Sequence, residues 1–577
     1  MMDKPWLRHY DQGVTASLRP YPEHPLHTFL EQSAAKYPNR PAIHFKPSHQ
    51  GFAKSALTYA ALNDLSDRTA AALADLGVKK GDRVMIFMPN IPQFVIAFYG
   101  ILKAGGVIVA SNPTYTAPEL EKQLKDSGAE TIICMSRFYP VVQKALPNTK
   151  VRNVIVTNIK EYMSGLLRVL FTLAREKKSG DRVELASGHI AFSDLMSKYR
   201  ASQRPKMDIG ADDRALFQYS GGTTGEPKAA IALHRNLVAN TLQIRSWFVN
   251  CTEGQETVLI AIPLFHVYGM VAGMSLAVQA AASMVLVPNA RELETVIDAI
   301  DACKPTIFPG VPRLYNAINN YPGIEKHDLR SIKACISGSA PLLLEIKNRF
   351  EANTGGKLVE GYGMSEAPTA SHCNPLSGLN KEGSIGLPFP DMECKIVSLD
   401  DEVTELGIGE IGELCIRGPQ VMLGYHADPA KTQNALRKDP KDPNGAAWLY
   451  TGDIARMDED GYFYIVDRKK ELIKVGGYQV WPREIEEAIA LHPAVLEVGA
   501  AGLTDPARGT EVVKAWVVLK PDVAATEEDI KKFIADKLAP YKQPRSIEFR
   551  SELPKTLVGK VLRRVLVEEE KKKMAVR

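Results

Sequence analysis

The sequence predicts an α/β fold, because stretches of strand character and stretches of helix character alternate along most of the chain. The alternation begins near residue 83 and recurs from residue 258 to residue 308. It is typical of parallel sheets whose two faces are covered by helices. In the first part the expected elements are a strand at 83–88, a helix at 91–104, a strand at 107–109, a helix at 117–126 and a strand at 131–135.

One apolar stretch needs a separate interpretation. From residue 257 to residue 290 there is no Asp, Glu, Lys or Arg, and a stretch of that length can span a bilayer. Pro263, His266 and Gly269 interrupt it, however. We therefore expect a strand at 258–262, a loop, a helix and a second strand at 284–287, all inside a large α/β core.

Two changes of pattern mark the domain organisation. Turns rich in Gly and Pro become frequent between residues 383 and 425, where short apolar runs at 394–397 and 413–416 indicate a smaller β subdomain. After residue 467 a block of about a hundred residues has its own pattern, with helices expected at 484–490 and 527–538 and strands at 495–503 and 512–519. We therefore expect a large domain at 1–468, with its β subdomain at about 383–468, and a small α+β domain at 469–577.

Composition excludes several classes of protein. The chain has 577 residues, of which 45% are hydrophobic and 24% charged, as in ordinary globular proteins. A net charge of +4 from 71 basic and 67 acidic residues gives no reason to expect nucleic-acid binding. The seven cysteines are widely spaced without a C-x-x-C pair, so we expect neither a zinc site nor disulfides. Together with an N-terminus that lacks an apolar signal core, this favours a cytoplasmic location.

The most specific motif is Ser-Gly-Gly-Thr-Thr-Gly-Glu-Pro-Lys at residues 220–228. Glycines let the backbone approach a ligand closely, and successive N–H groups, hydroxyls and a lysine can surround phosphate oxygens. The motif differs from G-x-x-x-x-G-K-[ST], because a proline separates its last glycine from the lysine. The expected phosphate-binding residues are Ser220, Gly221, Gly222, Thr223, Thr224, Gly225 and Lys228.

This motif resembles the phosphate loop of adenylate-forming enzymes, the superfamily of acyl-CoA synthetases, luciferases and peptide-synthetase adenylation domains. Further motifs follow in the order that the family requires, at 263–269, 337–341, 360–366, 450–453, 467–478 and 554–564. The opening at 5–10, an inserted helix at 162–178 and the length are most similar to bacterial long-chain fatty acid–CoA ligases. The resemblance implies two doubly wound sheets with a β subdomain, followed by a small mobile domain.

The resemblance also implies the nucleotide site. Residues along the adenine and ribose would be Gly338, Ser339, Ala340, Glu360, Gly361, Tyr362, Gly363, Met364 and Ser365. Glu366 and Thr223 would lie nearest Mg²⁺, a cation that takes hard oxygen ligands and keeps several waters. A structural alternative for Glu366 is a carboxylate at a helix N-terminus, and 337–341 alone would be a capped strand-to-helix turn.

Residues near the small domain complete the expected site. Asp453 would accept hydrogen bonds from both ribose hydroxyls, which suits an ionised carboxylate. Arg468 would contact ribose or phosphate, and Ile465 would also bind the nucleotide. Lys560 would bridge the carboxylate substrate and the α-phosphate. The hinge would be Lys470, and the residues that serve coenzyme A would be Lys474, Gly476 and Gly477.

The remaining expectations concern the acyl pocket and the partners. The resemblance places His266, Val267 and Met270 at the acyl pocket, and the tryptophan that gates some long-chain enzymes is absent there. The segment at 162–178 has apolar residues on one helical face beside basic ones, which fits either a surface helix packed on the large domain or a helix at the inner face of a membrane. A homodimer is a further expectation.

The expected activity is the ATP-dependent ligation of a long-chain fatty acid to coenzyme A through an acyl-adenylate, with Mg²⁺ as the metal. Alternatives are an adenylating ligase for a medium-chain or aryl acid, an enzyme that loads a carrier protein, and a non-catalytic nucleotide-binding regulator. The last is disfavoured because Glu366, Asp453 and Lys560 are all present.

Overall fold

The computed structural model describes residues 4–45, 55–220, 228–475, 478–505, 510–555 and 561–576. The chain forms two compact units. The larger unit contains Trp6–Glu393 and Arg417–Leu436, and the smaller unit contains Met1–Pro5, Cys394–Ile416 and Arg437–Arg577. The expected domain boundary at residue 468 stays a prediction.

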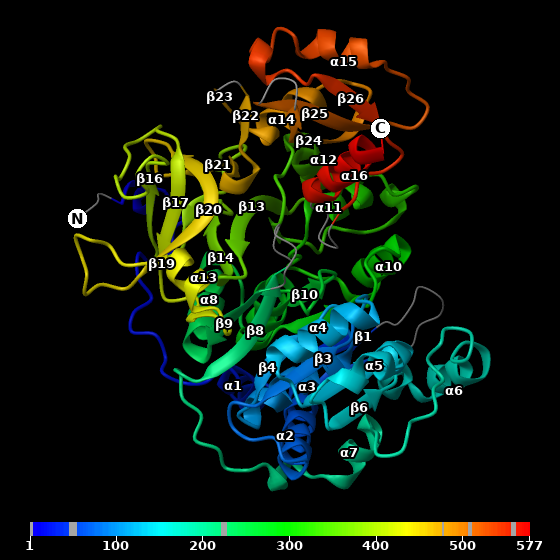
Figure 1. The fold of residues 1–577 in the computed structure, drawn as a ribbon. Coiled ribbons are helices and arrows are strands. Elements are labelled where there is room, and N and C mark those ends of the chain that lie inside the picture. The colour runs from blue at the N-terminus through cyan, green and yellow to red at the C-terminus, as the bar shows by residue number, and fades with distance from the viewer. Residues whose placement is uncertain are drawn as a thin grey trace. The chain divides into compact units, whose positions relative to one another are not determined.

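The first large sheet contains, within the described ranges, eight strands in the order β18-β9-β8-β4-β3-β5-β6-β7 (Figure 1). Strands β8, β4, β3, β5, β6 and β7 run parallel, whereas β9 and β18 add an antiparallel edge. The strands are β3 (Arg83–Phe87), β4 (Val107–Ala110), β5 (Thr131–Met135), β6 (Asn153–Thr157), β7 (Ile190–Ala191), β8 (Arg214–Ser220), β9 (Lys228–Leu233) and β18 (Gly424–Tyr425).

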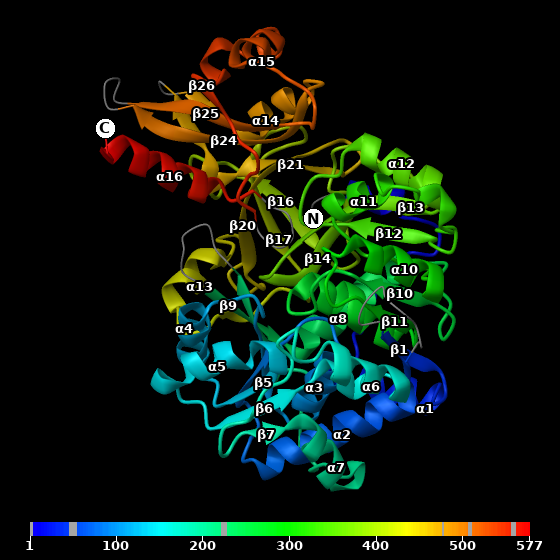
Figure 2. The same cartoon turned by 90° about the vertical axis from the view of Figure 1, so that its right-hand side faces the viewer.

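A second sheet of the larger unit is built in two parts. Isolated bridges at Ile307 connect the order β10-β11-β1-β2 to the order β12-β13-β14-β15 (Figure 2). The strands are β1 (Pro41–Phe45), β2 (Ser55–Thr58), β10 (Thr257–Ile260), β11 (Ser283–Leu286), β12 (Ala334–Ser337), β13 (Lys357–Met364), β14 (Ala367–Cys373) and β15 (Leu387–Pro388).

Helices cover these sheets as βαβ connections require. Side chains of α4 and α5 pack on one face of the first sheet, and α10, α11 and α12 pack on the second sheet. The helices of the larger unit are α1 (Thr28–Lys36), α2 (Tyr59–Asp75), α3 (Pro92–Lys103), α4 (Ala117–Ser127), α5 (Tyr139–Ala145), α6 (Gly165–Ala174), α7 (Phe192–Lys198), α8 (His234–Trp247), α9 (Leu276–Gln279), α10 (Leu293–Cys303), α11 (Pro312–Asn319), α12 (Leu344–Thr354) and α13 (Pro429–Ala435).

Local sequence explains where individual helices begin and end. Thr116 and Glu119 form a capping box at the start of α4, and Gly128 ends the helix in the left-handed conformation with φ 63°. Every residue of α3 is buried, as its nearly continuous apolar sequence requires. Its last residue, Lys103, is buried with its ammonium 2.8 Å from Asp67 Oδ1, which compensates the charge.

The described residues of the smaller unit form three separate sheets. A five-stranded sheet has the order β16-β17-β20-β19, with β21 paired to β20, and the hairpin β22-β23 and the sheet β24-β25-β26 follow. Helices α14 (Pro482–Ala490) and α15 (Glu527–Ile534) pack on the last sheet, and α16 (Arg563–Val576) ends the chain. The strands are β16 (Glu393–Val397), β17 (Gly412–Arg417), β19 (Leu436–Arg437), β20 (Trp448–Met457), β21 (Phe463–Arg468), β22 (Ile473–Val475), β23 (Tyr478–Val480), β24 (Val495–Asp505), β25 (Thr510–Leu519) and β26 (Ser546–Phe549).

The predicted α/β class is confirmed, and the predicted strands at 83–88, 107–109 and 131–135 agree with β3, β4 and β5 within one residue. The apolar stretch at 257–290 contains β10 and β11, as expected. The helix between them is different, because Tyr268–Ser275 forms a π-helix before α9 continues it. No helix among the described residues is long and apolar enough to cross a membrane.

Two buried histidines make the stability of the fold sensitive to pH. His234 Nδ1 accepts a hydrogen bond from the Leu26 N–H at 3.1 Å, and the ring of His27 lies 6.2 Å from that of His234. Burial lowers the pKa of His234 to about 4, and burial with the neighbouring His234 and Arg204 lowers the pKa of His27 to about 2. Both rings are therefore neutral in the folded protein at any pH near neutrality.

We predict that the free energy of unfolding falls as the pH drops below about 6.5, the pKa of an unfolded histidine. Below that pH the unfolded chain binds protons that the folded chain excludes, so each histidine costs about 1 kcal/mol between pH 6.5 and 5.5. Urea unfolding at pH 7.5, 6.5 and 5.5 measures the effect. His234→Gln should reduce the slope, and an identical slope in that variant would contradict the assignment to His234.

Candidate functional site

Several of the predicted site residues lie outside the described residues. These are Gly221, Gly222, Thr223, Thr224, Gly225, Gly476, Gly477 and Lys560. The strands on either side of the first group are described, however: β8 ends at Ser220 and β9 begins at Lys228, and these two residues pair in the antiparallel register. The predicted phosphate motif therefore connects the two strands of a hairpin.

Three side chains meet beside this hairpin. The Tyr425 hydroxyl donates a hydrogen bond of 2.8 Å to Glu366 Oε1, and Lys228 Nζ lies 5.1 Å from the centroid of the Tyr425 ring. Burial and the Glu366 carboxylate raise the pKa of Tyr425 above its ordinary value, so the phenol stays protonated and can donate. The structure thus brings together two predicted residues, Lys228 and Glu366, through a tyrosine that the sequence analysis did not identify.

Glu366 belongs to a strand-turn-strand element. It lies in the turn between β13 and β14, so the alternative of a helix N-terminal carboxylate is wrong. Its backbone carbonyl accepts the Met422 N–H at 2.8 Å. Within the described residues no group of three or more His, Cys, Asp or Glu side chains could hold a metal ion. A single half-buried carboxylate fits Mg²⁺, which proteins commonly hold through one or two carboxylates together with substrate phosphates.

The strand β13 carries the predicted base- and ribose-binding residues Glu360, Gly361, Tyr362, Gly363 and Met364, and Ser365 follows in the turn. The glycines have a structural cause that the sequence analysis missed. A Cβ atom on Gly363 would clash with the Thr369 carbonyl oxygen, and one on Gly361 would lie 2.8 Å from Ile336 Cγ2. Close packing of β13 against β12 at Gly361 and against β14 at Gly363 therefore requires glycine at both positions, whether or not a ligand is bound.

Glu360 connects two predicted segments of the site. Its Oε2 accepts the Leu342 N–H at 3.0 Å, which ties β13 to the segment that contains Gly338, Ser339 and Ala340. That segment is not the capped strand-to-helix turn considered as an alternative, because α12 begins only at Leu344 and its N-terminus has no side-chain cap. Ser339 has a φ of 78°, in the left-handed region.

The predicted acyl-pocket residues lie around the start of the π-helix. Val267 and Met270 are fully buried, and His266 is half-buried. Burial lowers the pKa of His266 to about 4, so the ring is neutral near pH 7, and its Nδ1 accepts the Tyr268 N–H at 3.2 Å. The Tyr268 hydroxyl donates to the Ile336 carbonyl at 2.6 Å, which links this helix to β12.

Asp453, Ile465 and Arg468 belong to the smaller unit, on paired strands β20 and β21. Asp453 lies directly opposite Arg468, and Arg468 Nε is 2.6 Å from Asp453 Oδ1. Asp453 is buried whereas Arg468 is half-exposed, so the arginine compensates a buried carboxylate. Arg483 Nη1 donates to the Ile465 carbonyl at 2.8 Å.

Lys470 and Lys474 are both exposed, and a cluster of ion pairs lies close to Lys470 in the sequence. The Lys474 backbone is held by Glu511 Oε2, which accepts its N–H at 2.7 Å. Arg563 forms the centre of the cluster: it contacts both oxygens of Glu486 at 2.8 and 2.5 Å, Asp467 Oδ1 at 3.3 Å, and Glu471. Asp467 and Glu471 flank Lys470, so one arginine joins the two sides of the predicted hinge.

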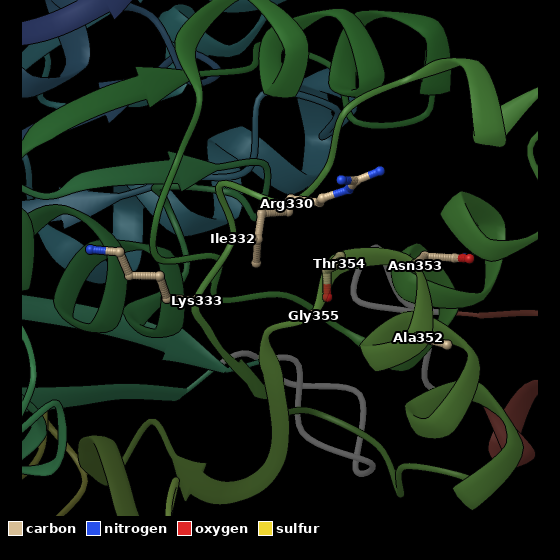
Figure 3. Close-up of a pocket in the computed structure, with 7 residues that line it drawn as sticks. All are labelled: Arg330, Ile332, Lys333, Ala352, Asn353, Thr354 and Gly355. Atoms are coloured by element: carbon tan, nitrogen blue, oxygen red, sulfur yellow. The ribbon is translucent and has the colours of Figure 1, made fainter.

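A cavity of about 520 Å³ lies away from the predicted site (Figure 3). It is lined by Arg330, Ile332, Lys333, Ala352, Asn353, Thr354 and Gly355. These residues precede β12 and β13, whereas ligands of α/β sheets bind beyond the carboxyl ends of the strands. Figure 3 shows the Arg330 and Lys333 side chains pointing in opposite directions, so the two cations do not converge on one ligand.

Comparisons with known proteins show the family of the chain. The family model described as AMP-binding enzyme matches residues 30–426, and the model of the AMP-binding enzyme C-terminal domain matches residues 484–560. A long-chain-fatty-acid–CoA ligase of Bacillus subtilis is 42% identical over 98% of both chains. One of Escherichia coli O157:H7 is 38% identical over 99% of both chains.

Solved structures of similar fold include enzymes with bound nucleotides. ATP-bound MatB from Rhodopseudomonas palustris has a TM-score of 0.80 at 26% identity, covering 94% of this chain and 99% of that one. The anthranilate CoA ligase AuaEII in complex with anthranoyl-AMP has a TM-score of 0.81 at 27% identity, covering 97% of this chain and all of that one. A long-chain-fatty-acid-CoA ligase from Archaeoglobus fulgidus has a TM-score of 0.68 at 26% identity, covering 94% and 99%.

Proposed function

The chain belongs to the family of AMP-binding enzymes, and we propose that it joins a long-chain fatty acid to coenzyme A through an acyl-adenylate, using ATP with Mg²⁺. The observation that carries this function is the match to long-chain-fatty-acid–CoA ligases over nearly the whole chain. The geometry supports it, since Lys228 and Glu366 lie together beside the hairpin of the phosphate motif. The products are acyl-CoA, AMP and pyrophosphate.

In the first half-reaction, a fatty carboxylate oxygen attacks the α-phosphorus of ATP, and the bond to pyrophosphate breaks. Lys228 and the phosphate motif hold the phosphates, while Lys560 offsets the charge that develops between carboxylate and α-phosphate. Glu366 and Thr223 would hold Mg²⁺, and the bound cation would neutralise charge on the phosphate oxygens. Asp453, compensated by Arg468, accepts the ribose hydroxyls.

In the second half-reaction, the thiolate of coenzyme A attacks the acyl carbon, and AMP leaves as the better leaving group. We assign this step to Lys474 with Gly476 and Gly477, and we assign to Lys470 the change of backbone angles that brings them to the site. Because Arg563 contacts Asp467 and Glu471 on both sides of Lys470, its ion pairs must rearrange when the hinge turns.

A panel of acids tests the proposed function. With ATP, Mg²⁺ and coenzyme A, kcat/KM should rise with acyl length by about fourfold per CH₂, because each buried methylene contributes about 0.8 kcal/mol, until the pocket is full. Palmitate and oleate should exceed acetate, benzoate and 4-coumarate. AMP and pyrophosphate release accompanies acyl-CoA formation.

Other outcomes of the panel select the alternatives. A preference for benzoate or 4-coumarate would identify an aryl acid ligase and contradict the long-chain assignment. Acid-dependent pyrophosphate exchange with no response to coenzyme A would indicate a carrier-protein loading enzyme. Nucleotide binding without exchange for any acid would indicate a regulator.

We further propose that α6 brings the enzyme to an anionic membrane surface. Figure 1 shows α6 at the edge of the larger unit, and none of its residues is buried. Its apolar side chains point to solvent: Leu166 is 73% and Leu173 is 81% exposed, and Val169 and Leu170 are about half exposed. The predicted alternative of a helix whose apolar face packs on the large domain does not fit these side chains.

The charges around α6 favour a lipid surface over other partners. Arg168, Arg175, Lys177 and Lys178 are all exposed. Glu176, the acidic residue of the segment 162–178, is buried and paired with Lys160 at 2.6 Å, and Asp181 just beyond the segment is buried and paired with Arg137 at 2.8 Å. The exposed charge of this segment is therefore positive beside an apolar face, which is the composition of helices that lie in the headgroup region of anionic bilayers.

Sedimentation with vesicles tests this contact. The protein should bind vesicles that contain phosphatidylglycerol more strongly than pure phosphatidylcholine vesicles, and high salt should weaken the binding. Leu166→Ser with Leu173→Ser should reduce binding at least tenfold, because each exposed leucine loses its transfer into the bilayer. Leu491→Ser, at another strongly exposed leucine, is the matched control.

Unchanged vesicle binding by the double variant would contradict the proposal. The proposal would also be contradicted if sedimentation velocity shows a dimer for the unmodified protein and a monomer for the double variant, because α6 would then be a contact between two copies. Sedimentation velocity of the unmodified protein also measures the expected homodimer, which does not depend on α6.

A further inference from the structure

The Tyr425 side chain contacts both charged groups of the predicted phosphate and metal site in the larger unit. Its hydroxyl donates to Glu366 Oε1 at 2.8 Å, and its ring supports the Lys228 ammonium at 5.1 Å from the centroid. An ammonium over an aromatic face is attracted by the ring, and a phenol is a good donor to a carboxylate. One side chain therefore connects the residue that ends the phosphate motif with the proposed metal carboxylate.

The backbone around Tyr425 is fixed by hydrogen bonds to the same two elements. The N–H groups of Leu423 and His426 donate to the carbonyls of Ile231 and Ala229 on β9, both at 2.9 Å. On the other side, the Met422 N–H donates to the Glu366 carbonyl at 2.8 Å. The segment 422–426 therefore holds the strand that begins at Lys228 and the turn that carries Glu366 in a constant relation.

The Tyr425 ring has little freedom of its own. The backbone N–H of Tyr425 donates to Thr432 Oγ1 at 2.8 Å. The Thr432 hydroxyl in turn donates to the Asp428 carbonyl at 2.9 Å, at the start of α13. A tyrosine has only two side-chain torsions, so a fixed backbone leaves the hydroxyl close to one position. With Oε1 held by this hydroxyl, the plane of the Glu366 carboxylate and the direction of its second oxygen are set.

From this geometry we propose that Tyr425 is a positioning residue for the first half-reaction. It orients Glu366 toward the Mg²⁺ carried by ATP, and it steadies Lys228 at the end of the phosphate motif. The inference rests on the proposed role of Glu366 as a metal ligand. It assigns no contact between Tyr425 and substrate.

Binding of α,β-methylene-ATP measured by calorimetry, with Mg²⁺ and with EDTA, tests the proposal without turnover. Tyr425→Phe removes the hydroxyl and keeps the ring. Its affinity in EDTA should therefore be unchanged, whereas its increase in affinity on addition of Mg²⁺ should be about tenfold smaller than that of the unmodified protein. Tyr425→Leu also removes the ring, so it should weaken binding in EDTA as well. Tyr10→Phe is the matched control, because its hydroxyl donates to the Pro388 carbonyl at 2.6 Å.

Two further measurements separate positioning from a merely structural role. Tyr425→Phe should raise the Mg²⁺ concentration that half-saturates adenylation, and it should leave thioester formation from synthetic acyl-adenylate unchanged. In a Glu366→Gln background, Tyr425→Phe should have no additional effect on the Mg²⁺ response, because the two residues act through one interaction.

Each contrary outcome has a distinct meaning. If Glu366→Gln loses the Mg²⁺ response while Tyr425→Phe keeps it, the proposal for Tyr425 is wrong and the role of Glu366 stands. If Glu366→Gln itself keeps the response, the metal role of Glu366 fails, and the proposal fails with it. Equal weakening of Tyr425→Phe in Mg²⁺ and in EDTA, with a lower Tm, would make Tyr425 a structural residue and overturn the proposal.

Discussion

The antiparallel pairing of β9 with β18 is the constraint on which the larger unit's part of the site depends. Gly424 pairs with Ile231 and Tyr425 with Ala230, although these residues are far apart in the sequence. This pairing adds an edge to an otherwise parallel sheet and brings Tyr425 to Glu366 and Lys228. Without it, the Glu366 carboxylate would be held only by the turn between β13 and β14, and the Lys228 ammonium only by β9.

The polar groups of the site are held mainly by other polar groups of the protein. Glu360 is bonded to the backbone of Leu342, Asp453 faces Arg468, and Glu366 accepts from Tyr425. Charged groups arranged before the ligand arrives need little reorganisation when charge develops on a phosphate, which is how electrostatic preorganisation favours a reaction. The same logic explains the neutral His266 beside a pocket proposed for an apolar chain, since burial disfavours its charged form.

The alternation of strands and helices, and the order of the motifs, could be predicted from the sequence because they depend on local pattern. Tyr425 could not, since a two-residue strand has no periodicity and its partner strand is remote. The π-helix at Tyr268–Ser275 was also missed, because its apolar composition is equally suited to an α-helix. The helix expected at 162–178 is shorter in the structure: Met163 precedes α6 and is buried, whereas Val169 and Leu173 belong to the exposed apolar face. Such details follow from tertiary packing and not from residue type.

The central claim is that one acyl-adenylate connects two half-reactions that use different lysines. The most direct measurement supplies synthetic oleoyl-adenylate and coenzyme A to Lys560→Ala and to Lys474→Ala, and compares each with the reaction from oleate and ATP. The account predicts that Lys560→Ala forms oleoyl-CoA from the adenylate at nearly the normal rate and loses about 10²–10³ in rate from oleate and ATP, whereas Lys474→Ala makes pyrophosphate normally and fails with the adenylate. Equal loss by Lys560→Ala from both starting points would contradict it.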